Sequence, residues 1–289
     1  GLYRQLSWAA NELNRGYYSW KGRGLSVLEF ADQQRVLLEA GLNPASAAIQ
    51  YLFSLGNTIN KWAVDISLNG FIRTYLQYFG DPFMSALDPL LPTNLVQPDL
   101  SLPFAAGEVW YYTGGPHGGW GSGSAWAALD FAPPDEWNPG MSLCFTSQYW
   151  VRAMADGVVA RSGDGVLILD LDMDDDESTA WSILYLHLAA EGLLPVGTTV
   201  KRGDPVGKAS CAGGFSTATH LHVARRFNGE WIAASCASCA PHLTTPDFVM
   251  DGWISVGIAG QEYQGSLERD GIQVRAEQGR ETLVNRISW

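Results

Sequence analysis

The stretch Thr219-His220-Leu221-His222-Val223 sets two histidines two positions apart among apolar residues. Side chains at positions i and i+2 of a β-strand point to the same face, so we expect His220 and His222 to project together while Leu221 and Val223 turn to the core. A lone H-x-H pair arises easily by chance, and strand parity cannot rank its two histidines. The partners of this pair must therefore be sought elsewhere in the chain.

A further histidine ends an apolar strand upstream. In Tyr185-Leu186-His187-Leu188, the residues Leu184, Leu186 and Leu188 form one apolar face. Strand alternation then predicts that His187 lies on the opposite face, with Tyr185. The alternative is a histidine that only faces solvent.

A fourth histidine lies in the glycine-rich run Gly114-Gly115-Pro116-His117, and Asp130 opens another predicted strand. Glycines let the backbone approach an ion closely. Histidine and carboxylate side chains from three separate segments suit catalytic zinc, which takes three protein ligands and leaves the fourth position to water. Neighbouring imidazoles could then carry the proton. The sequence contains no HExxH motif that would supply a glutamate base.

The part of the chain before these motifs is predicted to be helical. Apolar residues recur there at spacings of three and four: Leu6, Ala9, Ala10 and Leu13, and the pairs Val36 with Ala40 and Leu38 with Leu42. Asn43 is expected to cap a helix with Pro44 in its first position, and another helix is expected around residues 60–78. Four prolines between positions 82 and 98 indicate a linker. We place the boundary near Val96, between a helical domain of residues 1–95 and a β-rich domain of residues 96–289.

From residue 102 onward, short β-branched or alternating runs are separated by Gly, Asp and Pro. Strands are expected over residues 109–113, 149–153, 157–160, 166–171 and 181–188, with two or three more in the tail 253–289. The predicted fold class is α+β, a helical N-terminal region followed by a mainly antiparallel β-sheet.

Composition narrows the possible functions. With 289 residues, 46% of them apolar, the chain can bury a large core. A net charge of -12 disfavours nucleic-acid partners. No apolar run is long enough to be a transmembrane segment. The chain opens at Gly1 without a leader pattern, so we expect any signal peptide to be absent from it. The even number of cysteines, four, suits disulfides and an oxidising compartment.

Three smaller features have modest interpretations. The Cys236-x-x-Cys239 pair lacks a second half that would complete a zinc knuckle, so a local disulfide is expected. Alternating carboxylates from Asp170 to Glu177 resemble the opening of a calcium loop, but the glycine and glutamate that such a loop needs are missing. We favour a solvated hairpin tip there, with Ca²⁺ as the alternative. His242 has no informative context and is taken as structural.

Taken together, the motifs resemble the lysostaphin-like, or beta-lytic (LytM-type), zinc endopeptidases that cut peptide bonds in bacterial cell walls. The likeness covers about residues 102–231. It rests on Gly-Gly-Pro-His117 followed after twelve residues by Asp130, on Tyr-Leu-His187-Leu, and on Thr-His220-Leu-His222. Residues 155–159 and 200–207 resemble a strand and a turn of the same family.

The resemblance implies a function and a role for each residue. His117, Asp130 and His222 would hold one Zn²⁺, and His187 and His220 would form the catalytic pair. The implied fold is a duplicated-hybrid-motif-like sheet with an active-site groove for a peptide of peptidoglycan, a stem or cross-bridge, and the implied location is extracellular or the cell envelope. Which of the two histidines is the general base is left open.

The resemblance also favours one disulfide pairing, Cys144 with Cys211. Two other functions stay open. The same fold could serve as a non-catalytic zinc-containing binding or regulatory module. A phosphate-carrying histidine protein would use two facing histidines without a metal, but it would leave His117 and Asp130 unexplained.

Overall fold

The computed structural model describes residues 1–289 except 23, 85, 240–242, 244 and 281. Contacts between Cα atoms divide the chain into two compact units. Unit 1 contains the chain up to Leu90 together with Trp120–Ala125 and Leu243, and unit 2 contains the remaining described residues. Helices come first and antiparallel strands follow, which confirms the α+β class. The domain limits 1–95 and 96–289 stay a prediction. Within the described residues, no helix combines the length and the apolar character that crossing a bilayer requires.

Unit 1 is mainly helical. It contains α1 (Leu2–Lys21), β1 (Val27–Glu29), β2 (Arg35–Leu37), α2 (Pro44–Ser54), α3 (Ile59–Asp65) and α4 (Phe71–Phe79). The Asn43 side chain accepts a hydrogen bond from the Ser46 N–H and Pro44 opens α2, as predicted. Helix α1 packs on α2. A small core gathers Leu28, Phe30, Leu38, Ala47 and Trp62.

Two helical predictions for unit 1 are wrong. Val36 lies in β2, which pairs with β1 in an antiparallel hairpin. A spacing of four is even, so it also places two side chains on one face of a strand, and it cannot separate the two structures. The helix expected around 60–78 is two helices, because the chain turns at Gly70, where a Cβ would collide with the Asp65 carbonyl.

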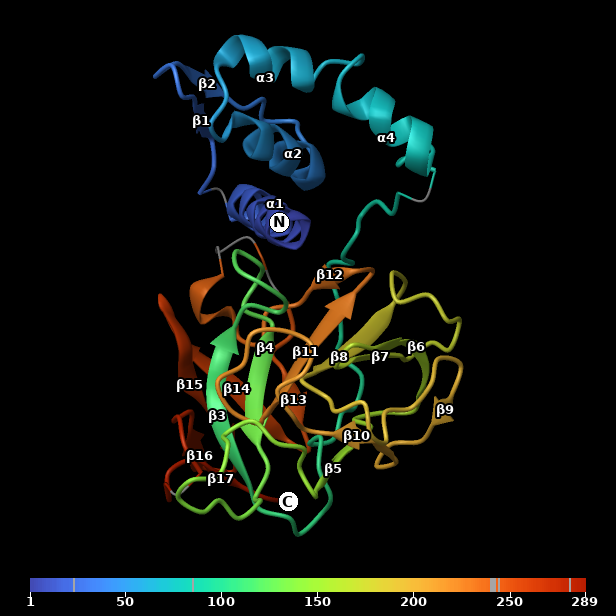
Figure 1. Ribbon diagram of the computed structural model, residues 1–289, viewed down its shortest axis with the longest axis vertical. Coiled ribbons are helices and arrows are strands. Elements are labelled where there is room, and N and C mark those ends of the chain that lie inside the picture. Colours follow the sequence, from blue (N-terminus) through green and yellow to red (C-terminus); the bar gives the residue numbers. More distant parts are fainter. Residues whose placement is uncertain (23, 85, 240–242, 244, 281) are drawn as a thin grey trace. The chain divides into compact units, whose positions relative to one another are not determined.

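Unit 2 is built of antiparallel strands (Figure 1). Its main sheet, nine-stranded in the described part of the chain, has the order β17-β3-β4-β11-β8-β7-β6-β9, with β12 beside β11. These strands are β3 (Trp110–His117), β4 (Ala128–Ala132), β6 (Gly157–Gly163), β7 (Val166–Asp170), β8 (Trp181–Leu186), β9 (Thr199–Val200), β11 (Leu221–Phe227), β12 (Glu230–Trp231) and β17 (Arg286–Ile287). A second sheet contains β13 (Val249–Met250), β14 (Trp253–Ile258), β15 (Gln261–Arg269) and β16 (Ile272–Arg275), and β5 (Trp150–Arg152) pairs with β10 (Pro205–Lys208). The predicted strands before residue 190 are all present, and the tail contributes four.

The main sheet has one face in the core of unit 2. Leu129, Tyr185, Leu221 and Val223 join this core, together with Leu267 of the second sheet. Residues that pair directly across two strands point to the same face. The residues that alternate with these core residues along β4 and β11 therefore occupy the opposite face of the sheet. The candidate site lies on that face.

The acidic stretch between β7 and β8 forms a hairpin tip, as favoured above. Donors within the loop reach some of its carboxylate oxygens: the N–H groups of Asp174 and Asp175 donate to Asp170 Oδ2, and Thr179 donates to Asp174. A calcium ion is not supported there, although Asp170, Asp172 and Asp174 bring carboxylate oxygens within 4.8 Å of one another.

Both expected disulfides, Cys144–Cys211 and Cys236–Cys239, are formed. The short η1 (Cys236–Ser238) lies inside the second one. His242 lies outside the described residues.

Candidate metal centre

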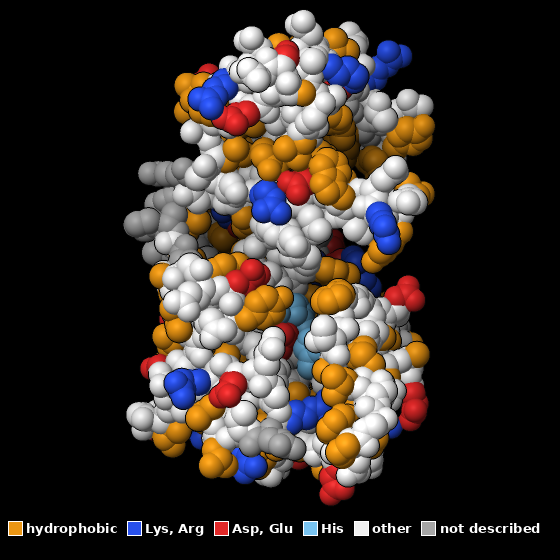
Figure 2. All heavy atoms as spheres, turned by 60° about the vertical axis from the view of Figure 1, so that its left-hand side comes forward, with side chains coloured by type: hydrophobic (Ala, Val, Ile, Leu, Met, Phe, Trp, Pro, Cys, Tyr) orange, Lys and Arg blue, Asp and Glu red, His pale blue; other side chains and the backbone are white. Residues whose placement is uncertain are grey.

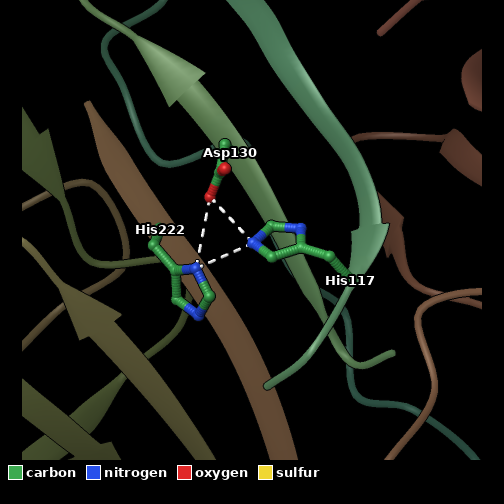
Figure 3. Close-up of side chains that lie close together, drawn as sticks. All are labelled: His117, Asp130 and His222. Atoms are coloured by element: carbon green, nitrogen blue, oxygen red, sulfur yellow. Dashed lines mark hydrogen bonds and ion pairs between the residues drawn. The ribbon is translucent and has the colours of Figure 1, made fainter. Parts of the chain in front are cut away.

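Three adjacent strands bring His117, Asp130 and His222 together (Figure 3). His222 on β11 pairs directly with Asp130 on β4, so their side chains share a face. His117 stands at the end of β3.

Two β-bulges aim His117 at this face. The register of β3 against β4 shifts between Tyr112 and Gly114 and again between Gly114 and His117, so that His117 lies opposite Ala128. Continuing from the Gly114–Asp130 pair without the second shift would place Pro116 opposite Ala128 and turn His117 to the other face. Bulges commonly re-aim side chains beside functional sites.

The three side chains present a nearly equilateral triangle of atoms. His117 Nε2 lies 3.0 Å from His222 Nδ1, and Asp130 Oδ1 lies 3.2 Å from each of these nitrogens. Four ligands at zinc bond lengths of about 2.0–2.1 Å form a tetrahedron with edges of about 3.3 Å. The triangle therefore fits one face of a tetrahedral metal site.

Carbonyl groups orient both imidazoles. His117 Nδ1 donates to the Gly115 carbonyl over 2.8 Å, and His222 Nε2 donates to the Gly119 carbonyl over 2.9 Å. Because a carbonyl oxygen only accepts, these nitrogens carry the hydrogens, and the opposite ring nitrogens turn lone pairs toward Asp130 Oδ1. That oxygen is buried and has no hydrogen-bond partner among the described residues. Backbone anchoring of the distal nitrogen is a common feature of histidines that ligate metals.

The three side chains are buried, and their charges shift one another's pKa values. His117, Asp130 and His222 are all buried. Burial raises the pKa of Asp130, but the neighbouring imidazoles of His117, His220 and His222 hold it well below its usual range. Burial lowers the pKa of His117, but Asp130, the Gly115 carbonyl and Glu262 together raise it above its usual value. The buried carboxylate thus draws positive charge to the triangle, and a cation at its centre would satisfy all three groups at once.

His187 lies on the same face of the sheet, although the alternation of side chains along β8 predicts the other face. It follows β8 and has φ +67°, a left-handed backbone that is uncommon outside glycine. The turn interrupts alternation, so that Tyr185 and Leu188 both join the core while the His187 ring approaches His220. The prediction that His187 lies on the Tyr185 face is therefore wrong.

His187 and His220 lie beside the triangle. Their ring centroids are 4.5 Å apart, and His220 Nε2 is 3.8 Å from Asp130 Oδ1. His187 Nδ1 donates to the Ala212 carbonyl and His220 Nδ1 to the Ala218 carbonyl, each over 2.8 Å, so that the Nε2 atom of each neutral ring carries a lone pair. Burial, and then His220, lower the pKa of His187 to about 4. Histidine side chains reach the surface of unit 2 among apolar side chains (Figure 2).

Sequence reasoning missed one aromatic contact. The Tyr263 ring on β15 stacks on the His117 ring, with centroids 4.3 Å apart and planes inclined by 20°. No motif surrounds this tyrosine, so no signal in the sequence pointed to it.

The buried group of His117, Asp130 and His222 on an antiparallel sheet, with two further histidines beside it, could hold a metal ion. Residues 137–234 match the model of peptidase family M23, and residues 1–93 match that of the LasA N-terminal domain. The M23 match contains His187, His220 and His222 but begins after His117 and Asp130. The chain carries a peptidase family M23 domain.

Curated relatives agree with these matches. Protease LasA of Pseudomonas aeruginosa strain PAO1 is 25% identical over 262 residues, which are 84% of this chain and 58% of the relative, and Protease LasA of strain UCBPP-PA14 gives the same values. The chain thus spans just over half the length of these relatives, and it is homologous to them.

Two solved structures are similar to part of the chain. The M23 metalloprotease pseudoalterin, from the deep sea, has a TM-score of 0.46 and 23% identity, covering 63% of this chain and 96% of that one. The catalytic domain of lysostaphin from Staphylococcus simulans has a TM-score of 0.30 and 23% identity, covering 45% and 94%.

Proposed function

We propose that this chain is an exported zinc metalloendopeptidase. His117 Nε2, Asp130 Oδ1 and His222 Nδ1 hold the metal. The observation that carries the proposal is the convergence of these three atoms, 3.0 to 3.2 Å apart, around a buried carboxylate oxygen that has no donor among the described residues. Neutral imidazole and carboxylate are ligands that zinc accepts.

The remaining two histidines move the proton. When bound, zinc supplies a water of lowered pKa and polarises the scissile carbonyl. The carbonyls of Ala212 and Ala218 hold the Nδ1–H groups of His187 and His220, so each Nε2 can take a proton from the attacking water and return it to the leaving amine.

The proposed substrate is a stem or cross-bridge peptide of bacterial peptidoglycan, which follows from the motif resemblance. Two disulfides support export, because such bonds persist in oxidising compartments. A net charge of -12 gives no long-range attraction to anionic wall polymers. Binding then depends on short-range contacts, and moderate salt should favour cleavage by screening repulsion.

The test combines metal analysis with digestion. Protein purified without chelator should contain about one zinc per chain and should release new termini, identified by mass spectrometry, from peptidoglycans of different cross-bridge types. His187→Ala and His220→Ala should keep zinc and lose cleavage, and their pH profiles identify the base. Asp130→Asn should lose zinc, whereas Asp172→Asn, at an exposed carboxylate of the acidic tip, should not.

Two outcomes would overturn the proposal. A protein without zinc removes the metal centre. A zinc-loaded protein that leaves every wall type uncut, with a biological effect unchanged by the His187 and His220 variants, is instead a non-catalytic module.

A further inference from the structure

The C-terminal hairpin of β14 and β15 lies outside the segment that matches the M23 model, yet it packs on the strand that carries His117. Strand β15 contacts β3 (Figure 1). A Cβ at Gly115 would lie 2.7 Å from the Gln264 carbonyl carbon, so the two backbones meet with no room for a side chain. Pro116 fits against glycines of the hairpin, 3.3 Å from the Cβ position of Gly257 and 3.2 Å from that of Gly265.

This backbone contact places Tyr263 over the metal ligand. The rings of Tyr263 and His117 stack at 4.3 Å, whereas Tyr263 itself remains 48% exposed. A large aromatic residue that is half exposed gains little from burial, so its orientation needs another cause. Tyr263 also has φ +66°, a left-handed conformation that costs a non-glycine residue stability and recurs at functional sites.

The neighbouring Glu262 contacts the backbone that follows the same residue. Its carboxylate accepts a hydrogen bond of 3.2 Å from the N–H of Gly118, the residue that follows His117. The hairpin thus touches both the ring of His117 and the peptide that leads away from it. The Gly115 carbonyl restrains rotation of the ring through Nδ1, and the stack restrains the tilt of its plane.

We propose that Tyr263, assisted by Glu262, is a positioning residue that holds the His117 ring ready for the metal, so that the hairpin is part of the metal centre. The proposal rests on the proposed function, since it presupposes a metal at the His117, Asp130 and His222 triangle. Removing the stack frees the ring, and metal affinity falls because the ligand must be reordered on binding.

The experiment measures zinc affinity of the full chain by competition with a chromophoric chelator, without substrate. Tyr263→Ala should bind zinc roughly 3- to 10-fold more weakly, from the usual strength of one aromatic pair. Tyr263→Phe keeps the ring and should bind as the wild type does. Ile258→Ala is the matched control, at a residue of the same hairpin that is 46% exposed. Glu262→Ala should weaken binding less than Tyr263→Ala, and Glu262→Gln should restore it.

A spectroscopic measurement separates positioning from general support. The cobalt-substituted Tyr263→Ala protein should show altered d–d absorption, while its thermal unfolding without metal matches that of Ile258→Ala. Wild-type zinc affinity in Tyr263→Ala would overturn the inference, and so would a Tyr263→Phe protein as weak as Tyr263→Ala. If the wild type binds no zinc, the proposed function fails instead, and the two failures are distinguishable.

Discussion

Gly114→Ala should weaken the proposed metal centre without replacing any of its ligands. Gly114 lies on β3 directly opposite Asp130, and both are buried. An added Cβ would be 2.7 Å from Asp130 Oδ2 and 3.1 Å from its Cβ and Cγ. Ordinary van der Waals contact begins at 3.4 Å, so the carboxylate must retreat by 3.4 − 2.7 = 0.7 Å, or the strands must separate.

That displacement is large for a metal ligand. Bond lengths in metal sites hold within about 0.2 Å, so a carboxylate moved by several times this amount cannot keep its place. We expect zinc affinity to fall about 10- to 100-fold, the usual effect of disturbing the groups around a ligand. Overpacking should also lower the free energy of unfolding by about 1–3 kcal/mol.

The assay is chelator competition on Gly114→Ala, with kcat/KM on a wall-derived peptide and the unfolding midpoint measured in parallel. Gly41→Ala is the control, because the same added methyl meets nothing within 4 Å there. If Gly114→Ala had the zinc affinity and kcat/KM of the wild type, the absence of a side chain at Gly114 would not be needed to position Asp130.

Three further predictions concern stability and metal content. Chelation should abolish cleavage, zinc should restore it, and zinc at 1,000 times its Kd should raise the free energy of unfolding by about 4 kcal/mol. Burial, reinforced by Asp172, raises the pKa of Asp170 to about 6. The folded state therefore binds the Asp170 proton more tightly than the unfolded state does, and the stability that this proton contributes is lost as pH rises from about 4 through about 6. In denaturant titrations, Asp170→Asn should be more stable than the wild type by about 2 kcal/mol at pH 7, but not at pH 3.5. Replacing Cys144 and Cys211 by serine opens a loop with a sequence separation of 67 and should cost about 4 kcal/mol, against about 2 kcal/mol for Cys236 and Cys239, which are 3 apart; equal losses would contradict the loop-closure reasoning.

The alternation of side chains along a strand correctly predicted which face each residue occupies wherever the strands are regular. The H-x-H stretch turns Leu221 and Val223 to the core and leaves His222 opposite Asp130, as alternation requires. Short β-branched runs likewise predicted the central strands. In these segments the local pattern and the packing agree, and the sequence alone specifies which face each side chain occupies.

The same alternation gave wrong or incomplete predictions where a strand contains a bulge or a left-handed residue. His117 reaches the site through a bulge, and His187 through a left-handed residue. Neither feature follows from local residue preferences, because each is fixed by pairing with strands distant in sequence. The helix prediction for the β1–β2 segment of unit 1 failed for another reason. The spacing of positions 36 and 40 is equally consistent with a helix and with a strand, so only tertiary packing decides which of the two forms.

The proposed metal centre draws on more of the chain than the segment that matches the family model. Residues 137–234 contain both proposed catalytic histidines but only one proposed ligand, His222. The other two come from β3 and β4, and their geometry depends on the Gly114–Asp130 contact on one side and on the Gly115–Gln264 contact on the other. A buried carboxylate and two imidazoles can meet at 3.0 to 3.2 Å only if these three segments are fixed together. On the proposed function, the strands after residue 250 belong to the functional unit, because they pack on β3.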